Sequence, residues 1–232
     1  MGFLKARGKA VLSLLISFLF LIAIPFNGNA TPYRKSKTEE KKIALTFDDG
    51  PSRRHTEEIL SVLAEYNISA TFFVIGENAV KDPERILSIA EAGHEIGNHT
   101  YTHAYISKIT ERQLRDELQK TEDALVKITG QRPRVFRPPG GYYNDASLAI
   151  VTEMGYKSVL WSLDTRDWSM PESDTVFSCV EENATAGDII LFHDLEDKRL
   201  PTPKALRKII PYLLENGYEF VTVSQLIENE AE

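Results

Sequence analysis

Two adjacent carboxylates and two histidines four residues apart are the side chains in this sequence best suited to chemistry. Asp48 and Asp49 lie next to each other in TFDDG, and His99 and His103 begin and end HTYTH. With this spacing, one helical turn or a tight loop points both imidazoles at a single ion. One carboxylate completes three protein ligands and leaves positions for water and substrate, which is typical of a catalytic metal site.

Hydrolysis also requires a base and an acid. The second carboxylate of the pair is available as a base, Arg137 is placed to keep it ionised, and His193 is a candidate acid. A bound divalent ion lowers the pKa of water toward ~7 and polarises a carbonyl group. Metal, base and acid together predict hydrolysis of an ester or amide. Two histidines and a carboxylate also suit a non-haem iron oxygenase, but a separate base and acid favour hydrolysis.

These residues follow short apolar runs that we expect to be strands. The expected strands cover residues 43–48, 70–76, 94–99, 135–138, 158–163, 188–193 and 218–223. Most are nearly continuous in apolar residues, as in strands that are buried on both faces. Amphipathic segments with helix caps separate them, so the alternation predicts an α/β fold with a parallel sheet and outer helices. A barrel is favoured over an open sheet because the chemical residues gather at the carboxyl ends of the strands.

Helix boundaries are marked by capping residues. Asp82 followed by Pro83 predicts a helix start, and Thr110 with Gln113 forms a capping box for a helix that ends at Gly130. In contrast to the site histidines, His94 begins an expected strand at the opposite end of the sheet. We therefore expect His94 to be structural rather than a ligand.

Composition excludes several classes of protein. The chain has 232 residues, of which 42% are hydrophobic, and a formal net charge of −7. This composition is that of a globular protein, and the acidic balance argues against a nucleic-acid partner. The single cysteine, Cys179, excludes an intramolecular disulfide framework.

The first thirty residues have the layout of an export signal. Basic residues precede an apolar run over 10–26, and small residues follow it, as in a secretory signal peptide. An uncleaved N-terminal anchor is the alternative. Residues 31–42 are polar and predict a short solvated linker, so residues 43–232 form the expected catalytic domain.

Five motifs occur in an order that resembles the polysaccharide deacetylases, the nodulation-protein-B-like domains of carbohydrate esterase family 4. The motifs are TFDDG (46–50), HTYTH (99–103), RPPGG (137–141), DTRDW (164–168) and LFH (191–193). The resemblance covers roughly residues 42–226. It implies a distorted, incomplete (β/α) barrel with about seven parallel strands.

The resemblance also implies roles for individual residues. Asp48 is similar to the general base, Arg137 to the arginine that pairs with it, and His193 to the general acid, which Asp167 tunes. The implied metal ligands are Asp49, His99 and His103. The implied substrate-binding residues are Gly140, whose backbone N–H stabilises the oxyanion, Tyr142, Trp168 and Leu191. Many family members carry an aromatic residue at the position of Gly140, and we expect Tyr142 or Tyr143 to supply the missing substrate contact.

The expected function is removal of acetyl groups from a polysaccharide by a secreted or cell-surface hydrolase. N-Acetylglucosamine units of peptidoglycan or chitin oligosaccharides are the expected substrate. The alternatives are an acetylxylan O-deacetylase and a catalytically silent glycan-binding protein on the same scaffold. Zinc is the default ion for this ligand set, with cobalt, nickel or manganese as alternatives. We expect a monomer with no nucleic-acid partner and no membrane contact beyond the N-terminal segment.

Overall fold

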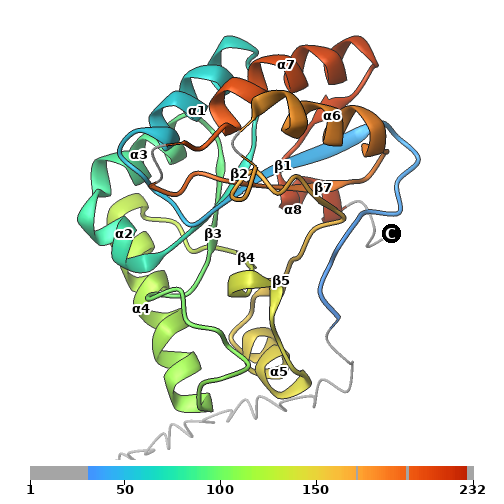
Figure 1. Cartoon of the computed structure of the whole chain (residues 1–232). Coiled ribbons are helices and arrows are strands. Elements are labelled where there is room, and N and C mark those ends of the chain that lie inside the picture. The colour runs from blue at the N-terminus through green and yellow to red at the C-terminus, as the bar shows by residue number, and fades with distance from the viewer. Residues whose placement is uncertain (1–30, 171, 197–198, 229–232) are drawn as a thin grey trace, which may run out of the picture.

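One curled parallel sheet organises the protein. The computed structural model describes residues 31–170, 172–196 and 199–228, so the expected export signal at residues 1–30 lies outside the described residues (Figure 1). Within these ranges, eight strands form the sheet in the order β5-β4-β3-β2-β1-β7-β6, and β8 pairs with β1. All their pairings are parallel. The strands are β1 (Lys42–Asp48), β2 (Thr71–Val74), β3 (Glu95–Asn98), β4 (Val135–Phe136), β5 (Lys157–Ser158), β6 (Leu163–Asp164), β7 (Ile189–His193) and β8 (Glu219–Phe220).

The central strands are buried on both faces, as their continuous apolar sequences predict. In β1, all residues after Lys42 are buried, and all four residues of β2 are buried. Phe47 of β1 stacks on Phe72 of β2 and on Phe192 of β7, with ring centroids 4.9 and 5.8 Å apart. Burial of these large rings stabilises the fold and fixes the strands that carry the site residues.

Helices pack around the outside of the curled sheet (Figure 1). They are α1 (His55–Glu65), α2 (Gly76–Lys81), α3 (Pro83–Glu91), α4 (Glu111–Thr129), α5 (Asp145–Glu153), α6 (Ser173–Asn183), α7 (Thr202–Glu215) and α8 (Val223–Glu228). The predicted caps are confirmed. Asp82 accepts a hydrogen bond from the backbone of α3, and Thr110 and Gln113 make both bonds of the capping box of α4. None of the helices in the described ranges combines the length and apolar composition needed to cross a bilayer.

The sheet is an incomplete barrel, and the prediction of its architecture is confirmed. One part of that prediction was wrong, because residues 158–163 do not form a single strand. They divide between β5, which pairs with β4, and β6, which pairs with β7. Since β5 and β6 are the two edges of the sheet, the short segment between them crosses the opening of the barrel.

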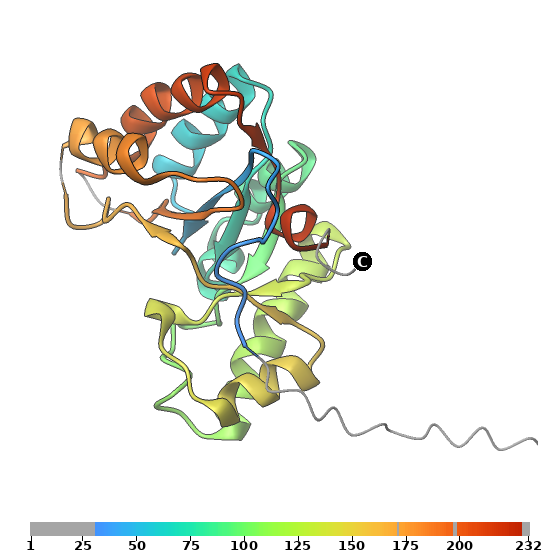
Figure 2. The same cartoon turned by 90° about the vertical axis from the view of Figure 1, so that its right-hand side faces the viewer.

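The N-terminal segment crosses the same opening. Tyr33 forms a parallel bridge with Val159, and Lys35 forms an antiparallel bridge with Asp188. Ser36 is buried and donates its backbone N–H to the carbonyl oxygen of Gly187. Figure 2 shows this blue segment running beside the sheet. A freely solvated linker makes no such contacts, so these residues are part of the packed structure despite their polar sequence.

Candidate active site

The carboxyl edge of the sheet brings the predicted chemical residues together. Asp48 ends β1, His99 follows β3, Arg137 follows β4, and His193 ends β7. Asp48 and His193 are register partners on neighbouring strands. Residues that are far apart in sequence therefore converge, because parallel strands place all their carboxyl ends at one rim.

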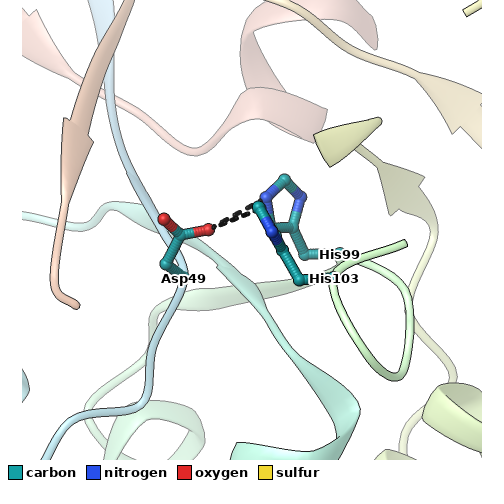
Figure 3. A group of neighbouring side chains, drawn as sticks. All are labelled: Asp49, His99 and His103. Atoms are coloured by element: carbon teal, nitrogen blue, oxygen red, sulfur yellow. Dashed lines mark ion pairs between the residues drawn. The ribbon is translucent and has the colours of Figure 1, made fainter. Parts of the chain in front are cut away.

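Three of these side chains form a group that is suited to a metal ion. Asp49 Oδ1 lies 3.3 Å from His99 Nε2 and 3.0 Å from His103 Nε2 (Figure 3). One ligand atom from each residue can be chosen so that all three lie within 4.8 Å of one another. An oxygen and two imidazole nitrogens converging on one point are a donor set that divalent transition metals accept. The residues present therefore fit a divalent cation.

The orientation and charge of these groups also suit metal binding. His99 Nδ1 donates a hydrogen bond of 2.8 Å to the carbonyl oxygen of Arg137, which leaves Nε2 as the nitrogen facing Asp49. Burial acts to raise the pKa of Asp49, but its hydrogen bonds with His103 and His99 outweigh burial and hold that pKa well below its ordinary value. Asp49 is therefore an ionised ligand at neutral pH.

Asp48 is buried beside this group and held by a buried cation. Arg137 Nη1 lies 2.7 Å from Asp48 Oδ1, while Asp48 Oδ2 faces His99 Nε2 at 3.8 Å. Arg137 is fully buried, and it also donates hydrogen bonds to Thr46 Oγ1 and to the carbonyl oxygen of Leu160. One oxygen of Asp48 is thus anchored by Arg137, while the other is directed toward the group of three ligands.

His193 is held by Asp167. Asp167 Oδ1 lies 2.7 Å from His193 Nδ1, and Oδ2 accepts the His193 backbone N–H at 2.8 Å. Burial acts to lower the pKa of His193, but the hydrogen bond and negative charge of Asp167 raise it to about 9. His193 is therefore a cation at neutral pH. Its Nδ1 is hydrogen-bonded to Asp167, so Nε2 is the ring nitrogen that does not contact this carboxylate.

Gly140 lies in the short turn η1 (Pro139–Gly141) and has a φ of 62°. A Cβ at this position would lie 3.0 Å from Tyr105 Cε1 and 3.0 Å from ring atoms of Tyr142. Glycine is therefore favoured here by the left-handed backbone and by the close approach of two tyrosine rings. These rings meet edge to face with centroids 5.7 Å apart, and Tyr105 also contacts His103 edge to face.

The other predicted substrate-binding residues differ in accessibility. Tyr142 and Trp168 are 61% and 59% exposed, whereas Leu191 is only 3% exposed. The carbonyl oxygen of Leu191 accepts a hydrogen bond from Thr165 Oγ1, which ties the segment after β6 to β7. Tyr142 and Trp168 have the accessible aromatic surface that sugar rings can contact.

Several residues near the site were not predicted. Tyr105 is 40% exposed, and the only sequence signal for it is an aromatic residue two positions after His103. Thr202 donates a hydrogen bond to Asp167 from the start of α7, and no local motif indicates this contact. Asp194 directly follows His193, and it accepts a hydrogen bond from Thr56, while burial raises its pKa to about 7.

Known proteins resemble this chain along most of its length. The family model for polysaccharide deacetylases matches residues 35–159. A peptidoglycan-N-acetylglucosamine deacetylase of Bacillus cereus is 43% identical over 190 residues, which are 81% of this chain and 89% of that protein. The crystal structure of the peptidoglycan N-acetylglucosamine deacetylase Bc1960 has a TM-score of 0.82 at 38% identity and covers 84% of this chain and 92% of its own. A family 4 acetyl xylan esterase from Clostridium thermocellum, solved with a cobalt ion, has a TM-score of 0.75 at 35% identity. The match covers 80% of this chain and 90% of the esterase chain.

Proposed function

This chain belongs to the polysaccharide deacetylase family, and from that premise we propose that it removes N-acetyl groups from N-acetylglucosamine units of peptidoglycan or chitin oligosaccharides. The observation that carries the proposal is the position of Asp48 between Arg137 and the Asp-His-His group, with His193 on the neighbouring strand. Peptidoglycan is favoured because the Bacillus cereus relative and Bc1960 are both peptidoglycan N-acetylglucosamine deacetylases.

Asp49, His99 and His103 would hold one divalent cation, with zinc as the default and cobalt, nickel or manganese as alternatives. When bound, the cation supplies Lewis-acid polarisation of the acetyl carbonyl and makes water a stronger nucleophile at neutral pH. The donor set supports this assignment, and so does the cobalt ion solved with the Clostridium thermocellum esterase.

Asp48 acts as the base in the proposed reaction. Its Oδ2 accepts a proton from the attacking water, while the guanidinium of Arg137 holds Oδ1 in place. Asp48 is buried and one of its oxygens is held by Arg137, so the carboxylate keeps one orientation toward the substrate. The Gly140 backbone N–H stabilises the negative charge that develops on the carbonyl oxygen.

His193 acts as the acid. With a pKa of about 9 it carries a proton at neutral pH, and it donates this proton to the leaving amine. Asp167 keeps the ring oriented through Nδ1 and stabilises the imidazolium. Tyr142 contacts the sugar with its exposed ring, and Trp168 and Leu191 border the acetyl group.

Action at the cell wall requires export, so we propose that residues 1–30 direct the protein out of the cell or to its surface. Their basic start and apolar run support this proposal. N-terminal sequencing of the protein recovered from the medium and from the cell surface would distinguish cleavage of this segment from its retention as an anchor.

The test is acetate release from peptidoglycan, chitin oligosaccharides and acetylated xylan after chelation and reconstitution with each metal. We expect activity on the N-acetylated polymers that is lost on chelation and restored by a divalent cation. Asp48→Asn and His193→Ala should each lower the rate by about 10²- to 10⁴-fold. Asp123→Asn, which changes an exposed carboxylate on α4, is the matched control and should keep full activity. Full activity of Asp48→Asn would remove Asp48 as the base.

O-Deacetylation of acetylated xylan is a second candidate, because the chain is similar to an acetyl xylan esterase. An ester expels a better leaving group than an amide, so ester cleavage depends less on the acid. If xylan is the substrate, acetate release from it should exceed release from both N-acetylated polymers, and His193→Ala should have a smaller effect. Glycan binding without acetate release under every metal would instead identify a silent binding protein.

A further inference from the structure

The loop that carries the two predicted histidine ligands has an unfavourable backbone. Thr100 and His103 have φ angles of 64° and 59°, which lie in the left-handed region that favours glycine. Only contacts from the surrounding structure keep non-glycine residues in this conformation. Within the loop, the Thr100 N–H donates to Asn98 Oδ1 and Thr100 Oγ1 accepts from the Ala104 N–H.

A carboxylate from α4 binds the middle of this loop. Glu117 Oε2 accepts the backbone N–H groups of Tyr101 and Thr102 at 2.8 and 2.7 Å. Glu117 Oε1 accepts the hydroxyl group of Thr102 at 2.9 Å. Hydrogen bonds to an ionised acceptor are stronger than those between neutral groups. Both amides lie between the two histidines, so Glu117 holds the chain at the point that sets their separation.

The other side of the loop is held by α2. The Gly76 and Glu77 N–H groups donate to the carbonyl oxygens of Thr100 and Tyr101 at 3.0 and 2.9 Å. A Cβ at Gly76 would lie 2.5 Å from Tyr101 Cδ2 and 2.6 Å from Thr121 Oγ1 of α4. Helices α2 and α4 therefore both pack closely against the loop. The backbone of α2 donates hydrogen bonds to the loop carbonyl groups, and Glu117 of α4 accepts hydrogen bonds from the loop amides.

We propose that Glu117 is a positioning residue that preorganises His99 and His103 for metal binding. It contacts the backbone between them rather than their rings, so it acts through the loop and not as a ligand. The proposal rests on the metal-dependent function proposed above. The capping box and 19-residue length of α4 make the helix a rigid support for this carboxylate.

The test is the affinity of the metal-free full chain for Zn²⁺ and Co²⁺, measured by competition with a chromophoric chelator. Glu117→Ala should weaken both affinities by about 10- to 100-fold, the effect typical of removing a group that orients ligands. Glu117→Gln keeps an oxygen that can accept both backbone amides, and it should bind within about threefold of the unchanged protein. At saturating metal, Glu117→Ala should recover most of its kcat, because the reacting groups are intact.

Two controls separate positioning from general stability. Asp116→Ala removes a neighbouring exposed carboxylate of α4 and should leave the affinity unchanged. Leu125→Ala creates a cavity in the main core cluster and should lower the Tm without weakening metal binding. Equal affinity in Glu117→Ala and the unchanged protein would overturn the proposal, and so would equal weakening by Leu125→Ala.

If Glu117→Ala gives too little folded protein, Thr102→Val tests the same contact by removing only the hydroxyl bond. It should weaken Zn²⁺ binding about threefold, and an unchanged affinity would count against Glu117. Failure of the unchanged protein to bind any divalent cation would contradict the proposed function itself, and this result is distinct from a failure of the Glu117 variants.

Discussion

The two ends of the sheet each hold a largely buried histidine, and the two histidines have different charge states at neutral pH. At the carboxyl edge, burial opposes protonation of His193, but Asp167 raises its pKa to about 9. At the amino edge, burial lowers the pKa of His94 to about 4, and its Nδ1 accepts the Ala70 N–H. Burial alone keeps an imidazole neutral, whereas a buried carboxylate partner keeps it charged.

The ion pairs at the two ends of the sheet differ in how far their side chains are exposed to water. Asp48 and Arg137 at the carboxyl edge have side chains that are 6% and 0% exposed, whereas Lys35 in the pair with Asp188 at the amino edge is 40% exposed. Burying charge costs stability unless each group is well paired. The carboxyl edge concentrates this costly arrangement, as functional sites do. In the pair at the amino edge the cation, Lys35, remains in contact with water, although Asp188 is 5% exposed.

The largest expected effect comes from removing the buried cation. Arg137→Met leaves the Asp48 carboxylate buried without a partner, so the free energy of unfolding should fall by about 3–5 kcal/mol. Acetate release should also be lost, because Asp48, the proposed base, is no longer held. Urea denaturation at pH 7 together with the acetate assay measures both effects.

The matched control lies just before the same strand. Arg134→Met removes a guanidinium that is 78% exposed, and stability should change by less than about 0.5 kcal/mol. Adding Asp48→Leu to Arg137→Met removes the unpaired charge, so stability should recover while activity does not. A loss below about 1 kcal/mol in Arg137→Met would contradict the contrast between the two edges.

Asp167→Asn should convert the environment of His193 into one resembling that of His94. Without the carboxylate, the pKa of His193 should fall from about 9 to 6.5 or below. The alkaline limb of kcat/KM should move down by about 2.5 pH units or more, and the rate at pH 8 should fall about 30-fold or more from the loss of protonated imidazole alone. A pH–rate profile measures this shift, and an unchanged alkaline limb would exclude His193 as the acid.

The same pKa shift has a defined sign for stability. Because the folded pKa of His193 exceeds the unfolded value of about 6.5, its pair with Asp167 stabilises the protein fully below pH 6.5. This contribution is lost as the pH rises toward 9. Denaturation of the unchanged protein and of Asp167→Asn at pH 6 and pH 9 should therefore differ more at pH 6.

His94 should show the opposite dependence with a smaller effect. Its folded pKa of about 4 lies below the unfolded value, so the neutral ring stabilises the protein above pH 6.5 and this stability is lost as the pH falls. Between pH 7 and pH 5 the loss is about 2 kcal/mol. His94→Gln should remove that part of the pH dependence while leaving acetate release unchanged. A reduced rate in this variant would mean that the amino edge also serves the reaction.

The sequence predicted those features that depend on neighbouring residues. Continuous apolar runs located β1, β2 and β7, and the capping residues Thr110 and Gln113 located the start of α4. Short motifs likewise located the residues at the strand ends. In each case the information lies within a few residues of chain, which is the range over which periodicity and capping act.

Features that depend on packing between distant segments were not predictable. Glu117 and Thr202 reach the site from helices, and no local pattern reveals which turn of a helix faces a loop. The run 158–163 divides between two edges because the curvature of the sheet decides its neighbours. The polar composition of residues 31–42 gave no sign that Tyr33 would pair through its backbone.

The smallest effect is expected at the ion pair of the amino edge, in which Lys35 is 40% exposed and Asp188 is 5% exposed. Lys35 Nζ lies 2.9 Å from Asp188 Oδ1, a distance close to that between Arg137 and Asp48. Distance alone would therefore rank the two pairs together, but Lys35→Ala should lower the free energy of unfolding by less than about 1 kcal/mol and leave the rate unchanged. Urea denaturation at low and high salt checks this, because the small loss should shrink further when salt screens the pair. A salt-independent loss of several kcal/mol would show that accessibility to water does not set the difference between the two ends of the sheet.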